Sequence, residues 1–206
     1  MKEPGWKELF SNKREVMMSI ITLAVAALAI TSYTSFLRQV EQRVGMAFTD
    51  PIHRLFQPID LSWPIFIILY GALVGAIVIT MSKPHLILRM IRAYTILIAI
   101  RILCMWLLPL DPPATMIVLA DPFAEVFAAN GGVPLTRDLF FSGHTSLMCM
   151  VGLMMPTKTT RYIFLTLSVL IGVAVIAQHV HYTIDVVVAP LAALTAVVLV
   201  GANKSS

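Results

Sequence analysis

The chain has 206 residues, of which 58% are hydrophobic and only 13% are charged. A soluble domain carries roughly 25% charged residues, so this composition excludes an ordinary soluble protein and predicts an integral membrane protein. The formal net charge of +4 gives no reason to expect nucleic acid as a partner, because in a membrane protein the placement of Lys and Arg matters more than their sum. The length suits a single domain over residues 1–206.

Six apolar stretches are long enough, or nearly long enough, to cross a bilayer, which takes about 20 residues. In chain order they are residues 17–37, 61–81, 86–108, 140–156, 162–178 and 182–200. The fourth and fifth stretches are short. We therefore predict an all-α fold, namely a polytopic bundle of six transmembrane helices.

Positive charges are distributed unevenly between the two ends of such a bundle. The side that holds both termini carries Lys2, Lys7, Lys13, Arg14, Lys83, Lys158, Arg161 and Lys204. The opposite side carries Arg38, Arg43, Arg54 and Arg137, diluted by acidic residues. The positive-inside rule then predicts that both termini lie in the cytoplasm.

Two loops on the opposite side are predicted to be irregular. Residues 109–139 contain several Pro and Gly residues, and we interpret this segment as a lid or a cap that selects the substrate headgroup. Part of the loop between the first two stretches reads as an interfacial helix. His53 in that loop and His85 read as ordinary surface residues.

Two short motifs stand at the edges of apolar stretches, where ionisable groups are costly and usually functional. One is Ser142-Gly143-His144-Thr145, and the other runs from His181 to Asp185. The predicted topology brings both motifs to the non-cytoplasmic face, which is periplasmic or lumenal. Neither motif was used to choose the spans.

Their chemistry is that of metal-free phosphoryl transfer. Positions four apart on a helix are neighbours, so Asp185 can orient His181 and leave one ring nitrogen as a nucleophile. His144 can then act as general acid and base. We predict no metal and no cofactor.

Further residues are expected to bind the substrate. Gly143 permits close approach of a phosphate, Ser142 and Thr145 offer hydroxyl groups, and Arg101 supplies a positive charge that a phosphate would pair. The other candidates are Asp138, Tyr182 and His179. Each motif alone has a structural interpretation as well: the first as a loop or helix cap, the second as a structural pair. Arg101 has the alternatives of pairing with Asp111 or extending toward the interface.

The string DLFFSGHT followed by QHVHYTIDVVVA resembles the sphingomyelin synthase branch of the type 2 phosphatidic acid phosphatase (PAP2) superfamily. The resemblance covers roughly residues 89–189. It implies a six-helix membrane core, a nucleophile at His181 oriented by Asp185, and acid/base work at His144. It also implies transfer of a phospho-headgroup from a glycerophospholipid to ceramide, with release of diacylglycerol.

The chain departs from its relatives at several positions. Thr136 and Arg137 replace the Cys-Gly pair of the synthase branch. The Lys-x6-Arg-Pro motif of the lipid phosphatases is missing, and Val175 stands where those enzymes have a second arginine. A monoester dianion needs more positive charge than a diester, so these absences favour a diester donor.

Three functions follow as hypotheses. The first is a lipid phosphotransferase with a phosphohistidine intermediate, acting on phospholipid with ceramide-like or diacylglycerol lipids as partners in the bilayer. The second is a lipid phosphate phosphatase that uses the same residues and water. The third is a non-catalytic membrane scaffold or transporter. The sequence leaves the headgroup, the acceptor and the oligomeric state open.

Overall fold

The computed structural model describes residues 5–119 and 135–201 of the chain. Within these ranges it contains seven α-helices, one short 3-10 helix and no strand, apart from an isolated bridge between Met46 and Leu110. The predicted all-α class is confirmed for this part of the chain. The centre of the loop expected to act as a lid, residues 120–134, lies outside the described residues, as do Lys2 and Lys204.

The helices follow the six predicted apolar stretches. In chain order they are α1 (Trp6–Ser11), α2 (Lys13–Glu41), η1 (His53–Leu55), α3 (Ser62–Thr80), α4 (Pro84–Leu107), α6 (Gly143–Met154), α7 (Lys158–Ala177) and α8 (Thr183–Leu199). α2 extends beyond its stretch at both ends, because the Lys, Arg, Glu and Gln residues there are good helix formers. The loop expected to hold an interfacial helix contains only the single turn η1.

Three helices, α2, α3 and α7, are long and apolar enough to cross a membrane. α6 and α8 are apolar but have only 12 and 17 residues. α4 has 24 residues but carries Arg89, Arg92 and Arg101. Large aliphatic side chains are exposed along α2, α3, α7 and α8, as expected of surfaces that face lipid. The helices therefore fit a membrane protein, while the number of six spans stays a prediction.

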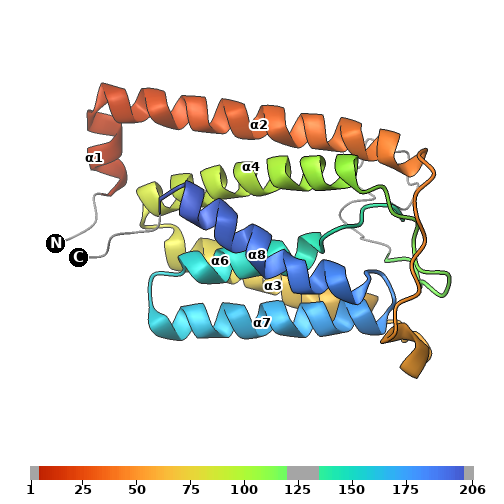
Figure 1. Cartoon of the computed structure of the whole chain (residues 1–206). Helices are drawn as coiled ribbons and strands as arrows, with labels where there is room; N and C mark the ends of the chain where they lie inside the picture. Colours follow the sequence, from red (N-terminus) through yellow and green to blue (C-terminus); the bar gives the residue numbers. More distant parts are fainter. Residues whose placement is uncertain (1–4, 120–134, 202–206) are drawn as a thin grey trace.

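α6 lies at the centre of the bundle and packs against α3, α4, α7 and α8, while α2 packs along α4 (Figure 1). Small side chains on α8 face this core, and they are Ala189, Ala192, Ala193 and Ala196. Gly172 of α7 permits a close crossing with α8, because a Cβ atom there would lie 2.8 Å from Cγ1 of Val186.

α6 and α8 both begin at the same end of the bundle. In Figure 1 this is the right-hand end, where the segment that follows α2 (orange) runs across the bundle toward α3. α1 and the last turn of α8 lie at the opposite end. The fold thus brings the starts of α6 and α8, and with them the two histidine motifs, to one end of the molecule.

Candidate active site

The two histidine motifs are in direct contact through their backbones. The amide of Ser142, which caps the start of α6, donates a hydrogen bond of 3.0 Å to the carbonyl of Asp185 in the first turn of α8. These residues are 43 positions apart in the sequence, so the contact depends on the packing of the two helices. The prediction that the two motifs lie together is therefore consistent with the fold.

His181 and Asp185 form a buried pair. Nδ1 of His181 lies 3.3 Å from Oδ2 of Asp185, and both side chains are at least 95% buried. The same carboxylate oxygen accepts the amide of Tyr182 at 3.2 Å, which fixes the carboxylate at the start of α8. When Nδ1 carries the proton, it donates to the carboxylate and Nε2 keeps its lone pair. The geometry gives Asp185 the means to orient His181 as a nucleophile.

His144 stands in the first turn of α6, one residue after Gly143. Its side chain is half-buried, and its ring lies edge-on to Phe66 of α3 with 6.3 Å between the ring centroids. Free backbone amides at the start of a helix, together with the helix dipole, favour an anion nearby. His144 thus lies at the start of a helix, and its acid/base role stays a prediction.

Arg101 of α4 is buried and holds the segment that leads into α6. Its guanidinium pairs with the Asp138 carboxylate at 2.8 Å and donates to the backbone carbonyls of Asp138 and Phe141. Its Nε also donates to the hydroxyl of Tyr33 in α2 at 2.8 Å. Arg101 therefore positions the turn before Ser142, and its charge is balanced by a carboxylate of the protein. The expectation that a phosphate pairs with it stays a prediction.

The other residues expected to bind substrate also have partners inside the protein. The Ser142 hydroxyl accepts the amide and the hydroxyl of Thr145, a helix cap of the ordinary kind. The Tyr182 hydroxyl donates to the carbonyl of Asp111 and accepts the amide of Phe48. In this conformation these side chains shape the site, and their binding roles stay predictions.

Thr136 and Arg137 tie the segment before α6 to the end of α2. Their backbone amides donate to the carboxylate of Glu41, and the guanidinium of Arg137 pairs with Asp111 at 2.8 Å. These bonds brace the two residues that precede Asp138, the partner of Arg101.

No pattern in the sequence indicated a role for Asp50, which lies in the segment between α2 and η1. Its carboxylate accepts the amide of Thr183 at 2.5 Å and its hydroxyl at 3.1 Å, and it also accepts the amide of Ile52. Burial alone would raise the pKa of Asp50, but these hydrogen bonds outweigh it and lower the pKa, so the group is ionised at neutral pH. Asp50 thus fastens the loop to the first turn of α8, two residues after His181.

His53, expected to be a surface residue, is instead stacked on His179. Their ring centroids lie 4.0 Å apart, and Phe56 packs edge-on against His179. Nδ1 of His179 bonds to the hydroxyl of Thr115 at 2.6 Å, while Nε2 of both histidines is buried without a hydrogen-bond partner among the described residues. His179 has a φ of +56°, a conformation uncommon for residues other than glycine. The reading of His53 as an ordinary surface residue was wrong, because the loop folds back onto the turn before α8.

The stacked pair predicts that stability falls at acidic pH. Burial lowers the pKa of His53 and of His179 below the ordinary value of about 6.5. The negative charge of Asp50 raises both pKa values, but by less than burial lowers them. Below pH 6.5 the unfolded chain therefore binds more protons than the folded chain, and stability is lost as the pH falls through that value. The melting temperature in detergent should be highest above about pH 7 and should decline toward pH 5.

A His53→Phe variant tests this explanation, because it keeps an aromatic ring in the stack but removes one titrating group. Its melting temperature should depend less on pH between 7 and 5 than that of the unaltered protein. Parallel pH profiles for the two proteins would show that the histidine stack is not the cause.

A second prediction concerns Gly143, whose backbone lies against Arg101. A Cβ atom at this position would lie 3.0 Å from Cζ of Arg101 and 3.2 Å from both Nη atoms. The guanidinium cannot move away without breaking its bonds to Asp138 and Phe141. Gly143→Ala should therefore cost about 1–3 kcal/mol in the free energy of unfolding, the usual range for overpacking.

Gly71→Ala in α3 is the matched control, because no atom lies within 4 Å of a Cβ built there. It should leave the stability unchanged or raise it slightly, since alanine favours a helix over glycine. Chemical denaturation in detergent measures both variants. Equal stability of the two variants would contradict the close contact at Gly143.

Comparison with known proteins matches the C-terminal part of the chain to a protein family. Residues 137–201 match the family described as PAP2 superfamily C-terminal. No curated protein and no solved structure matches the chain. The matched range includes His144 of α6, Asp185 of α8 and His181 in the turn between α7 and α8. The match shows that the C-terminal part of the chain is similar to the PAP2 superfamily.

Proposed function

We propose that the chain is a membrane phosphotransferase that moves a phospho-headgroup from a glycerophospholipid to the hydroxyl group of ceramide or a similar lipid. The family match supports a lipid enzyme of the phosphatase or phosphotransferase type. The observation that carries the proposal is the buried His181–Asp185 pair, bonded through Ser142 to the start of the helix that holds His144.

The first half of the reaction forms a covalent intermediate. Nε2 of His181 attacks the phosphorus atom, a bond forms between nitrogen and phosphorus, and the bond from phosphorus to the glycerol oxygen breaks. His144 gives its proton to that oxygen, and diacylglycerol leaves. Asp185 stabilises the positive charge that develops on the His181 ring, as an orienting carboxylate does in other enzymes with a histidine in this role.

The second half transfers the headgroup phosphate to the acceptor. The acceptor hydroxyl loses its proton to His144, its oxygen attacks the phosphorus atom, and the bond to Nε2 breaks. His181 returns to its neutral form, and His144 is protonated again for the next cycle.

The ion pair between Arg101 and Asp138 supports a diester as the donor. This arginine, which contacts Gly143, is already paired with Asp138. A diester carries a single negative charge, whereas a monoester such as phosphatidic acid carries up to two and needs more positive charge at the site. The absent lysine and arginine of the phosphatase motifs point the same way.

A lipid phosphate phosphatase is the second candidate, because the matched superfamily includes such enzymes. It would use the same three residues, with water in place of the acceptor hydroxyl. The two functions differ in their donor and in their dependence on ceramide.

Lipid mass spectrometry distinguishes these functions. Vesicles that carry the protein are offered phosphatidylcholine, phosphatidylethanolamine, phosphatidylinositol and phosphatidic acid, each with and without ceramide. The proposal predicts diacylglycerol together with a new ceramide-linked phospholipid, formed from a diester donor only when ceramide is present. Release of inorganic phosphate from phosphatidic acid alone would establish the phosphatase instead. No conversion of any of these lipids would contradict both functions.

A further inference from the structure

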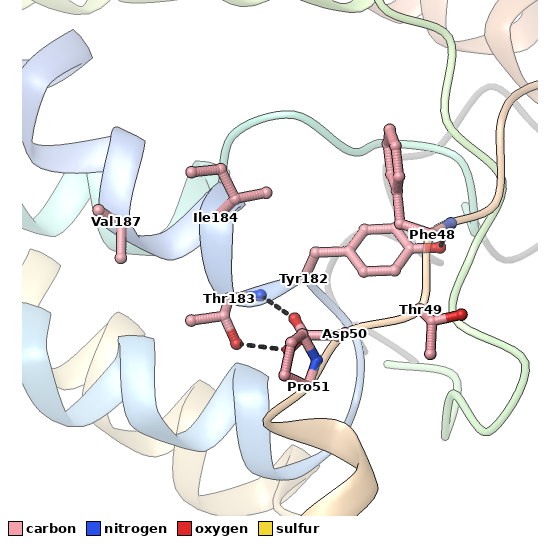
Figure 2. Close-up of a pocket in the computed structure, with 8 residues that line it drawn as sticks. All are labelled: Phe48, Thr49, Asp50, Pro51, Tyr182, Thr183, Ile184 and Val187. Atoms are coloured by element: carbon pink, nitrogen blue, oxygen red, sulfur yellow. Dashed lines mark hydrogen bonds between the residues drawn. The ribbon is translucent and has the colours of Figure 1, made fainter.

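A pocket of about 310 Å³ lies beside the start of α8, between this helix and the segment that follows α2. Phe48, Thr49, Asp50 and Pro51 line one side, and Tyr182, Thr183, Ile184 and Val187 line the other (Figure 2). Tyr182, one of these lining residues, directly follows His181 in the chain. A molecule in it lies next to the turn that holds the proposed nucleophile.

The polar groups of this pocket are already used within the protein. Asp50 accepts both bonds from Thr183 that Figure 2 draws, and it accepts the amide of Ile52 as well. The Tyr182 hydroxyl is bonded on both its donor and its acceptor side. What the pocket offers an occupant is mainly the apolar surface of Phe48, Ile184 and Val187. Its occupant should therefore be a hydrocarbon.

The pocket is continuous with the lipid-facing side of α8. Ile184 and Val187 are 51% and 60% exposed. At helical spacing beyond them follow three more exposed aliphatic residues, which are Leu191, Leu194 and Val198. This stripe runs along the helix and ends at the pocket. A lipid that lies along α8 can thus reach the catalytic turn without leaving an apolar surface.

We propose that this pocket receives the glycerol-proximal hydrocarbon of the donor phospholipid, and that the donor approaches His181 sideways from the bilayer along α8. The inference rests on the proposed function, because it assumes that a phospholipid phosphate reaches His181. It adds the surface by which the donor arrives and the residues that hold its chains. Asp50 keeps the pocket in shape by fastening its two walls to each other.

Ile184→Trp tests the proposal by filling the pocket with a larger side chain. Half of the Ile184 side chain is exposed, so the fold should accommodate the substitution. Leu170→Trp is the matched control: it places the same ring at a similarly exposed position, 49% against 51%, on a different helix, α7. Far-UV circular dichroism and gel filtration confirm that both variants are folded.

The first readout is independent of turnover. Phosphatidylcholine and phosphatidylethanolamine that carry a photoactivatable group near the acyl carbonyl are incorporated into vesicles with each variant and illuminated. Mass spectrometry of the peptide that contains residues 48–51 should show labelling in the unaltered protein and in Leu170→Trp, and at least about a tenfold loss in Ile184→Trp. Equal labelling of this peptide in both variants would overturn the proposal.

The second readout is kcat/KM for a donor with 16-carbon chains. It should be about tenfold lower in Ile184→Trp than in Leu170→Trp, mainly through KM, since the catalytic residues are unchanged. Equal values would also overturn the proposal. Selective loss of labelling in a protein that converts none of the lipids would instead retain the pocket assignment and contradict the proposed function.

Discussion

Replacing His181 with alanine is expected to lower the rate of headgroup transfer by at least about 10³-fold, as removal of a catalytic nucleophile does in other enzymes. The ring is buried beside Asp185, with Nδ1 at 3.3 Å from Oδ2 of the carboxylate. The substitution removes the atom that forms the covalent bond. The rate is measured as the loss of labelled phospholipid in vesicles of the composition that supports turnover.

Asp185→Asn should also lower this rate, by about 10² to 10⁴-fold, because the nucleophile remains but its tautomer is no longer fixed. His85→Ala is the matched control, since this histidine lies at the start of α4 and contacts Glu15 of α2, remote in the fold from the ends of α6 and α8 that form the site. It should retain the rate of the unaltered protein. Full activity of His181→Ala would exclude this histidine as the nucleophile.

Replacing Arg101 with methionine should cost about 3 kcal/mol in the free energy of unfolding, because it leaves the Asp138 carboxylate without its partner. The Arg101 side chain is only 6% exposed and makes bonds to α2 and to the segment before α6. The turn that carries His144 should lose its fixed position as well. Denaturation in detergent measures the first effect, and the transfer rate measures the second.

A double-mutant cycle separates the stabilisation by the Arg101–Asp138 ion pair from the other effects of Arg101→Met. Asp138→Asn removes the charge that Arg101 neutralises, so the double variant should lose less stability than the sum of the two single variants, with a coupling of about 0.5–3 kcal/mol. Arg161→Met on the exposed start of α7 serves as the control and should be nearly neutral. Strict additivity of Arg101→Met and Asp138→Asn would show that the ion pair does not stabilise the fold.

The helices could be predicted from the sequence because each is a long apolar run bounded by polar or turn residues. α3 begins and ends within one residue of the predicted stretch. The local pairing of His181 with Asp185 followed from the spacing of four residues alone. For Arg101, the high cost of a buried charge indicated a partner, and the structure supplies Asp138 and Tyr33 for that role.

Contacts between distant segments could not be predicted in this way. Asp50 and Thr183 are 133 residues apart, and Tyr33 and Asp138 are 105 apart. No periodic pattern links such residues, because their contact depends on how the helices pack and on how the loop after α2 folds back over α8. For the same reason the sequence did not predict that His53 stacks on His179, although both histidines were considered separately.

Trapping the covalent intermediate tests the role of His181 most directly. The Asp185→Asn variant and the unaltered protein are mixed with a phospholipid labelled in its headgroup, quenched at alkaline pH within milliseconds to seconds, and mapped by mass spectrometry. The proposed mechanism predicts the labelled headgroup phosphate on His181, at a level that falls when ceramide is added to the unaltered protein. Continued turnover with no label on His181, or with the label on another residue, would contradict it.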